Sequence, residues 1–395
     1  FGNNRLVHAI LRRTRWAKCI ASAQLYNQRH GVLQYNRQMP ESIMFPDYCG
    51  SGLINLMQSV AKACGGQSQR YPELHALPAE RLSEARHIVL LVADGLGQKM
   101  LDTLPGTHNL RRQHLSTMSS VFPSTTASAI PSFMSGLAPA GHGLTGWHMY
   151  FSEIDQTLAV LPLRARAEAS STLPPTVPSR LFDYPTLYQQ LDRECWVLAP
   201  RTIVGSPFNA WHSRGAQTIA YAGLAELFGE LAGLLKNAAQ PRLIYAYYSD
   251  LDALAHRFGC TSMPLQKAVA AFDQSFARFV DENQGSNAWL LVTADHGFID
   301  SPPERVISLD DHPALAVFLH RPLCGERRAA YAYVEPAQHA AFEAYIKQYL
   351  SHAVDLRRSR ELIKTGLFGP PPVHHRLSER VGDYTLLMRA NWTIK

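Results

Sequence analysis

The chain has 395 residues, and 46% of them are hydrophobic. That is enough apolar material for one large α/β domain or two modest ones, with a core that needs no disulfides. The formal net charge is +6, but residues 1–40 hold seven Lys or Arg and no Asp or Glu, which leaves 31 basic against 32 acidic residues in the remainder. A nearly neutral body gives no argument for a nucleic-acid-binding face.

The sequence shows no clear targeting or membrane segment. No apolar run reaches the roughly 18 to 20 residues that a membrane span requires, and Arg12, Arg13 and Arg15 interrupt the stretch that a signal peptide would need. Six irregularly spaced cysteines without a C-x-x-C pair favour a reducing compartment. We therefore expect a cytoplasmic protein with a basic extension at 1–40, or a membrane-surface helix over 5–25, and one folded body at 41–395. The oligomeric state stays open.

Apolar strands and amphipathic helices alternate along the folded body. The pattern predicts helices at 54–63, 223–239, 263–283 and 336–350, and strands at 87–93, 115–122, 195–198, 242–248, 288–294, 314–320, 331–334 and 384–388. The runs at 87–93 and 288–294 are continuously apolar, as in strands buried on both faces. We expect an α/β fold with a mostly parallel central sheet and helices on both faces.

Residues 144–214 are irregular and rich in proline and aromatic residues. We expect a lid inserted over the site at about 145–215, although ordinary surface loops have the same composition. Its aromatic side chains could stack on a nucleotide base or simply pack the lid, and the candidates are Trp147, Tyr150 and Phe208.

A hydroxyl-rich turn at 121–143, VFPSTTASAIPSFMSGLAPAGHG, precedes a run of small residues. Short side chains at Ser124, Thr125 and Thr126 can cap a helix whose first N–H groups face an anion. Taken alone, this stretch is better explained by an ordinary helix cap.

Acidic and histidine residues follow three of the predicted strands. Asp94 ends one strand, Asp252 and His256 lie four apart after a second, and Asp295 and His296 end a third. Since the carboxyl ends of parallel strands meet at one edge, Asp94, Asp252 and Asp295 should converge. A hydroxyl with oxygen and imidazole ligands is typical of a two-metal phosphoryl-transfer site. A late histidine, His374 or His375, could complete the set.

The order of these motifs resembles the alkaline phosphatase superfamily, and within it the type I phosphodiesterase and nucleotide pyrophosphatase family. The motifs are Asp-Gly after a strand, Phe-Pro-Ser-Thr-Thr-Ala, Ser-Gly-Leu-Ala-Pro-Ala-Gly-His-Gly, Asp-x-x-x-His, Asp-His-Gly and a late His. The resemblance runs from about residue 55 to residue 389. It implies an alkaline-phosphatase-like catalytic domain over 41–395.

The resemblance also implies roles for single residues. Thr126 is the nucleophile, one metal is held by Asp94, Thr126, Asp295 and His296, and a second is held by Asp252, His256 and His374, with His375 as the alternative to His374. The sequence departs from animal members at Ala129, where those place an Asn that holds a phosphate oxygen; backbone N–H groups or Ser128 could substitute. Histidine ligands favour Zn²⁺, with Mn²⁺ as the alternative.

The function implied is hydrolysis of small nucleotide-type phosphodiesters or pyrophosphates through a phosphothreonine on Thr126. A phosphomonoesterase or phosphonate hydrolase on the same metals is the close alternative, because a fold does not fix a substrate. The absence of Lys and Arg from 121–143 favours diesters, which carry less charge. A binding protein that keeps the scaffold without catalysis is the third possibility.

Overall fold

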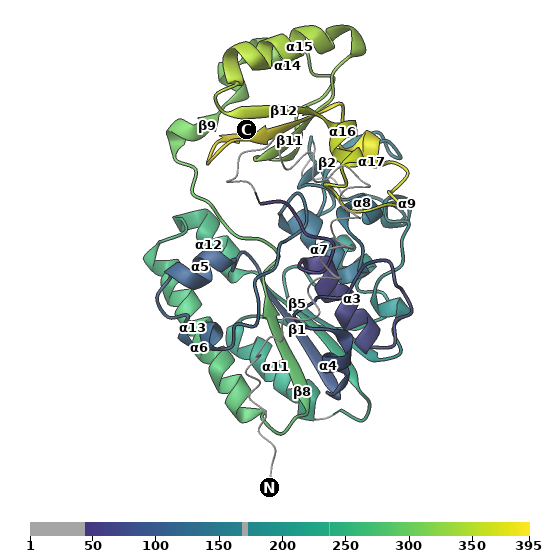
Figure 1. The fold of residues 1–395 in the computed structure, drawn as a ribbon, viewed down its shortest axis with the longest axis vertical. Coiled ribbons are helices and arrows are strands. Elements are labelled where there is room, and N and C mark those ends of the chain that lie inside the picture. Colours follow the sequence, from purple (N-terminus) through teal and green to yellow (C-terminus); the bar gives the residue numbers. More distant parts are fainter. Residues whose placement is uncertain (1–43, 168–172, 237) are drawn as a thin grey trace, which may run out of the picture.

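Five apolar segments form a parallel central sheet in the computed structural model, which describes residues 44–167, 173–236 and 238–395 (Figure 1). Its strand order is β6-β5-β7-β1-β8. The strands are β6 (Gln217–Tyr221), β5 (Glu194–Pro200), β7 (Arg242–Tyr248), β1 (His87–Ala93) and β8 (Ala288–Thr293). Each pairs with its neighbour in parallel register, for example Val89 with both Ile244 and Leu290.

Helices cover both faces of this sheet, which explains why its strands read as continuously apolar. Alternate residues of β1 enter two different cores. Ile88, Leu90 and Val92 pack with helices α3 (Leu53–Ala63) and α7 (Thr126–Ser135). Val89, Leu91 and Ala93 pack with α11 (Leu224–Lys236) and α13 (Met263–Glu282). The predicted fold class is confirmed, and it follows from burial of both sheet faces.

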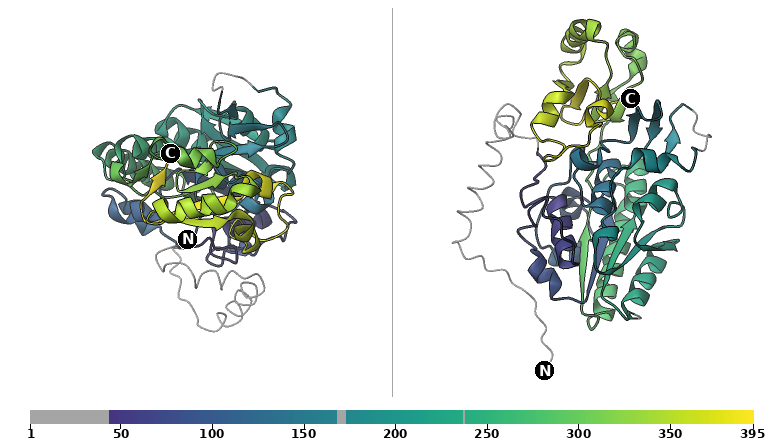
Figure 2. Two further views of the ribbon diagram at one scale, coloured as in Figure 1. Left: turned by 90° about the horizontal axis from the view of Figure 1, so that it is seen from above. Right: turned by 90° about the vertical axis from the view of Figure 1, so that its right-hand side faces the viewer.

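A second sheet of seven strands lies beyond one end of the central sheet (Figure 2). Its order is β12-β13-β11-β10-β2-β3-β4 and its pairs are antiparallel. The strands are β12 (Val354–Arg358), β13 (Tyr384–Met388), β11 (Ala329–Ala332), β10 (Cys324–Glu326), β2 (His148–Phe151), β3 (Gln156–Ala159) and β4 (Arg164–Ala165). Two short strands, β9 (Val306–Ile307) and β14 (Thr393–Ile394), pair in parallel elsewhere.

Several expected strands therefore differ from the structure. The segments at 331–334 and 384–388 belong to the antiparallel sheet, where β11 pairs with both β10 and β13. Only Arg327 and Arg328 separate β10 from β11, whereas a parallel crossover needs a dozen or more residues. The segment at 314–320 contains a short helix, α14 (Pro313–Val317). Residues 115–122 form no strand in the described chain; Ser119 makes one isolated bridge to Gly52.

The remaining helices are short and mostly connect strands. They are α4 (Ala79–Ser83), α5 (Gln98–Thr103), α6 (His108–Arg112), α8 (Pro139–His142), α9 (Val177–Leu181), α10 (Pro207–His212), α12 (Asp250–Phe258), α15 (His339–Tyr345), α16 (Ser359–Lys364) and α17 (Leu377–Arg380). Single 3₁₀ turns span Tyr188–Gln190, Pro303–Arg305, Leu309–Asp311 and Pro336–Gln338, and a π turn at Ile346–Leu350 extends α15. The segment at 145–215, where we expected a lid, contributes β2, β3 and β4 to the second sheet and β5 to the central one.

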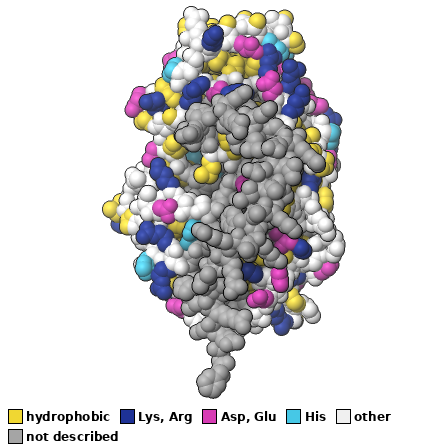
Figure 3. Space-filling model, viewed as in Figure 1, with side chains coloured by type: hydrophobic (Ala, Val, Ile, Leu, Met, Phe, Trp, Pro, Cys, Tyr) yellow, Lys and Arg dark blue, Asp and Glu magenta, His cyan; other side chains and the backbone are white. Residues whose placement is uncertain are grey.

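The basic extension at 1–40 and the helix considered at 5–25 lie outside the described residues. Among those that are described, no helix is both long and apolar enough to cross a membrane. Where described residues form the face in Figure 3, Lys and Arg alternate with Asp and Glu and no patch of one sign forms.

Two glycines allow the second sheet to approach the turn that precedes its strand β2. A Cβ on Gly146 would lie 2.6 Å from the Cα of Gly325, and Gly325 itself has φ +80°. A side chain at position 325 would also lie 2.4 Å from the carbonyl oxygen of Ala329. Only glycine combines this backbone conformation with so close a contact.

We predict that Gly325→Ala lowers the free energy of unfolding by about 2 kcal/mol or more, since both the strained φ and the backbone clash oppose it. Gly229→Ala, in α11 with no atom near the new Cβ, should change it by less than about 1 kcal/mol in the stabilising direction. Urea denaturation of both variants gives the comparison. Equal stabilities would show that the close approach of Gly325 to Gly146 and Ala329 does not constrain the fold.

Candidate functional site

The three predicted strand ends do converge. Strands β7, β1 and β8 are neighbours in the sheet, so the residues that follow them lie along one edge. Asp94 follows β1, Asp295 follows β8 after Ala294, and α12 carries Asp252 and His256 after β7. The side chains of Asp94, Asp252 and His296 place ligand atoms within 4.8 Å of one another.

Thr126 lies beside this group. It is the first residue of α7, which follows an extended Thr125 at φ −148° and ψ 153°. Its Oγ1 is 2.9 Å from Nε2 of His296 and 3.4 Å from Oδ1 of Asp94, to which it donates. The hydroxyl from the turn and the acidic strand ends, 32 to 170 residues apart in sequence, thus meet at one point.

Three carboxylates surround the imidazole of His296. Its Nε2 is 3.3 Å from Asp94 Oδ1, 3.5 Å from Asp295 Oδ2 and 3.9 Å from Asp252 Oδ1. His256, at the rim and largely exposed, has its Nε2 3.5 Å from Asp252 Oδ1. Asp295 is fully buried and is oriented by the backbone N–H groups of Gly95 and His296, which both donate to its Oδ1.

The pKa values follow from this crowding. Burial, and then the charges of Asp295 and Asp252, raise the pKa of Asp94 well above its ordinary value, although Tyr247 donates a hydrogen bond that opposes the rise. Burial likewise raises the pKa of Asp252. Burial alone would lower the pKa of His296, but the charge of Asp295, the hydrogen bond to the carbonyl of Gly297 and the charge of Asp252 together outweigh it, and the net shift is upward. The three carboxylates around His296 therefore lack enough positive charge nearby to compensate them.

The donor set fits divalent cations. Asp295 Oδ2 and Asp252 Oδ1 are buried and accept no hydrogen bond from the described residues, and buried carboxylate oxygens are otherwise nearly always satisfied. The Nδ1 of His296 is 3.0 Å from the carbonyl oxygen of Gly297, which can only accept, so Nδ1 carries the hydrogen. The lone pair of the neutral ring is then on Nε2 and faces the carboxylates, as in metal-bound histidines.

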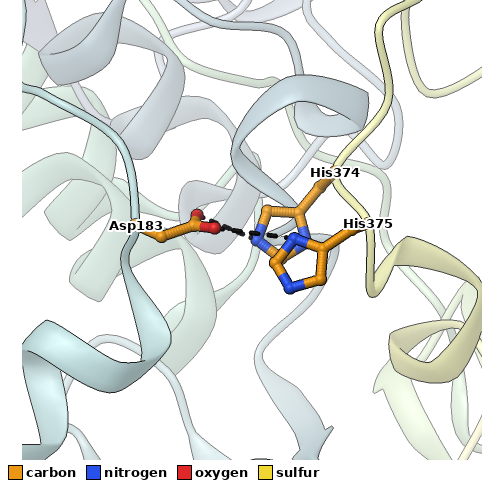
Figure 4. A group of neighbouring side chains, drawn as sticks. All are labelled: Asp183, His374 and His375. Atoms are coloured by element: carbon orange, nitrogen blue, oxygen red, sulfur yellow. Dashed lines mark hydrogen bonds and ion pairs between the residues drawn. The ribbon is translucent and has the colours of Figure 1, made fainter.

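His374 differs from the expectation. The structure places it in a second group, with Asp183 and His375 (Figure 4), and not beside the pair Asp252–His256. Its Nε2 is 3.1 Å from Asp183 Oδ1, and its Nδ1 accepts a hydrogen bond from the N–H of Arg376. With Nδ1 accepting, the neutral ring carries its hydrogen on Nε2 and donates it to Asp183, the reverse of His296. His375, the alternative, stacks on His374 and has its Nδ1 3.5 Å from Asp183 Oδ2.

The three aromatic candidates have different surroundings. Phe208 is buried, stacks on His212 at 4.0 Å and contacts Phe182, so it belongs to the core and not to a base-binding surface. Tyr150 lies on β2 with the guanidinium of Arg321 3.4 Å above its ring. Trp147 is 39% exposed, and its backbone N–H bonds to Glu326, which also binds Thr125. Of these three residues, only Trp147 is both exposed and connected, through Glu326, to Thr125 in the hydroxyl-rich turn.

Sequence reasoning missed three residues at or near these groups. Tyr247 donates to Asp94 Oδ2 from inside β7, Glu326 reaches Thr125 from β10, and Asp183 holds His374. Tyr247 precedes Asp252 by five residues and could have been noticed as a hydroxyl at the same strand end. Glu326 and Asp183 carry no local signal, since their roles depend on the second sheet and on the loop before α17. Ala129 and Ser128 are both buried, and Ser128 Oγ makes no hydrogen bond to the described residues.

Comparisons with known proteins identify the family and proteins of similar fold. The family model described as type I phosphodiesterase / nucleotide pyrophosphatase matches residues 88–395. An inactive threonine-to-alanine variant of murine ectonucleotide pyrophosphatase / phosphodiesterase 5, in complex with AMP, is similar at 15% identity with a TM-score of 0.58, over 78% of this chain and 79% of that one. The human protein of the same name gives 15% and 0.56, over 78% and 80%.

A bacterial enzyme is also similar. Phosphonoacetate hydrolase from Sinorhizobium meliloti 1021, in complex with phosphonoformate, has 17% identity and a TM-score of 0.55, over 79% of this chain and 83% of that one. A search of curated proteins gives no match. At these identities the structural similarities establish the fold.

We predict that Zn²⁺ raises the melting temperature through the Asp94 group and not through His374. At a free Zn²⁺ concentration 100 times Kd the stabilisation is about 2.7 kcal/mol. Asp295→Asn should remove most of the shift, whereas His374→Gln should retain it. A shift lost in His374→Gln and kept in Asp295→Asn would reverse the assignment.

Proposed function

We propose a reaction from one premise: the chain belongs to the type I phosphodiesterase / nucleotide pyrophosphatase family, whose model covers residues 88–395. The protein is a hydrolase of that family. We propose that its substrates are small nucleotide-type phosphodiesters or pyrophosphates and that Thr126 is its nucleophile. The observation that carries this proposal is the position of the Thr126 hydroxyl, 2.9 Å from His296 and 3.4 Å from Asp94 at the start of a helix.

The similar proteins support the nucleophile and the substrate class. The murine variant is described as inactive after replacement of a threonine by alanine, and it holds AMP. Thr126 is the threonine of this chain that meets the acidic strand ends, and a nucleotide contains both the base that Trp147 could stack on and the phosphate that the turn could receive.

Two divalent ions fit the ligands. We assign one to Asp94, Thr126, Asp295 and His296, and the other to Asp252 and His256; histidine ligands favour Zn²⁺ over Mn²⁺. Bound there, the ions would supply the positive charge that lowers the pKa of the Thr126 hydroxyl and offsets charge on the phosphoryl group. We do not assign His374 to either ion, because the hydrogen on its Nε2 faces Asp183.

The protein's own groups arrange the reaction. The hydrogen of the Thr126 hydroxyl faces two acceptors, Asp94 Oδ1 at 3.4 Å and the unprotonated Nε2 of His296 at 2.9 Å, which leaves an oxygen lone pair free to attack phosphorus. The P–O bond to the leaving group breaks as the bond to Thr126 forms, and the hydroxyl proton passes by way of Asp94 to the departing oxygen. For a diester, the resulting phosphothreonine keeps the second ester group. Water then attacks the same phosphorus, the bond between phosphorus and the Thr126 oxygen breaks, and one proton of that water restores the hydroxyl as the product leaves.

The other expectations remain proposals. We propose residues 41–395 as the catalytic domain, preceded by the basic extension at 1–40, with part of the insertion at about 145–215 serving as a lid. We also propose Tyr150 as a second substrate contact and a cytoplasmic location. Phosphomonoesters and phosphonates are the alternative substrates, and they are included in the test below.

We predict that Thr126→Ala abolishes hydrolysis of a chromogenic phosphodiester, by about 10³-fold or more since the attacking atom is removed. Zn²⁺ binding, measured by calorimetry, should weaken by much less than activity. Wild-type turnover should be lost after chelation and restored by Zn²⁺. The matching phosphomonoester and a phosphonate are assayed in parallel, and the diester should be cleaved fastest.

Thr202→Ala is the control, because Thr202 is exposed and has the same side chain. It should keep wild-type turnover. Near-normal activity in Thr126→Ala would remove the nucleophile from the proposal, and faster cleavage of the monoester or phosphonate would replace the substrate class while keeping the site.

A further inference from the structure

A carboxylate that has no assigned role lies next to the nucleophile. Glu326 is the last residue of β10 and is only partly exposed. Its Oε1 accepts two hydrogen bonds, from the hydroxyl of Thr125 at 2.8 Å and from the N–H of Trp147 at 2.6 Å. Thr125 directly precedes Thr126 in sequence, so the carboxylate belongs to the immediate surroundings of the reacting hydroxyl.

The fold is built to bring Glu326 there. β10 joins β2 only through the pair Gly325–His148, and the absence of side chains at Gly146 and Gly325 lets the two segments touch. Residue 326 then projects across from the second sheet to the N-terminus of α7. Two donors from different segments bond to one oxygen of this carboxylate, so its side chain is held in one position.

The contact also changes how α7 begins. An N-cap threonine normally uses its hydroxyl oxygen to accept a backbone N–H of the first turn. Thr125 makes no such capping bond, and its hydroxyl donates to Glu326 instead. The negative charge of Glu326 is thereby held at the helix end that would also receive the phosphate.

The same charge reaches the rest of the site. Glu326 and His296 interact electrostatically: the carboxylate contributes to the upward pKa shift of His296, and the imidazole opposes the rise that burial causes in the pKa of Glu326. The site therefore contains a fourth acidic group in addition to Asp94, Asp252 and Asp295. Unlike those three, Glu326 is not assigned to a cation.

We propose that Glu326 makes the protein selective for substrates of low charge. Its carboxylate repels phosphoryl groups with two negative charges, so phosphodiesters are preferred over phosphomonoesters. This inference rests on the proposed function and narrows it to monoanionic phosphoryl groups. A diester presents one charge to the site, while a monoester near neutral pH presents close to two. Each additional charge is repelled by a carboxylate held at the same helix end, and bulk water screens the repulsion poorly at a partly buried position.

Glu326→Gln is the direct test, because the amide oxygen can still accept from Thr125 and from Trp147 while the charge is lost. We predict that the ratio of kcat/KM for a chromogenic phosphomonoester to kcat/KM for the matching diester rises about tenfold, the effect expected of one unit charge at an intermediate effective dielectric. The wild-type protein, loaded with Zn²⁺, is measured in the same assay. An unchanged ratio would overturn the inference.

Two further variants separate charge from position. Glu326→Asp keeps the charge with a shorter side chain, and its ratio should stay near the wild-type value even if both rates fall; a rise equal to that of Glu326→Gln would contradict charge selection. Glu335→Gln removes an exposed carboxylate that lies beyond the end of β11 and pairs with His320, and it should leave the ratio unchanged.

Binding of inorganic phosphate gives a readout that does not depend on turnover. If Glu326→Gln is inactive toward both substrates, calorimetry with phosphate decides: about tenfold tighter binding than in the wild type supports the inference, and equal binding refutes it. Absence of all activity in the wild-type protein would instead reject the proposed function, so the two failures are distinguishable.

Discussion

The proposed site depends on the close approach of three carboxylates to the imidazole of His296 and the hydroxyl of Thr126. Asp94, Asp252 and Asp295 approach His296 within 3.3 to 3.9 Å, and buried oxygens of two of them accept no hydrogen bond from the described residues. Such crowding of like charges is unfavourable unless cations or protons compensate it. The same crowding suits the site to hold divalent ions and to stabilise charge that develops during phosphoryl transfer.

The topology of the parallel sheet produces this arrangement directly. Because β7, β1 and β8 are adjacent and run in the same direction, three separate segments deliver their carboxylates to one edge without any long side chain or unusual loop. The hydroxyl comes from a different element, the start of α7, and Glu326 of the second sheet bonds to the residue that precedes it. The groups that we propose for catalysis therefore come from the central sheet and α7, and the group that we propose for selectivity comes from the second sheet.

The sequence was sufficient for what depends on local pattern. Strands such as 87–93 are continuously apolar because both faces are buried, and the acidic residues after them were identified by position alone. The sequence was insufficient where the structure depends on contacts between distant segments. The short strands at 331–334 and 384–388 show no local pattern that identifies antiparallel partners. Phe208 could not be distinguished from an exposed aromatic residue without its contact to His212.

The position of His374 could not be predicted for a related reason, since its partner Asp183 lies 191 residues away. The role of Glu326 could not be predicted from the sequence, because its contact with Thr125 depends on Gly146 and Gly325, which look like ordinary turn residues.

The central claim is that the Thr126 oxygen becomes bonded to phosphorus during turnover. The direct measurement is rapid acid quenching of the Zn²⁺-loaded protein during hydrolysis of a phosphodiester, followed by peptide mass spectrometry to locate the phosphoryl adduct. The account predicts an adduct on Thr126 that still carries the second ester group of the substrate. An adduct on another residue, or steady turnover with no adduct on Thr126 at any quench time while a phosphorylated peptide standard survives the same treatment, would contradict it.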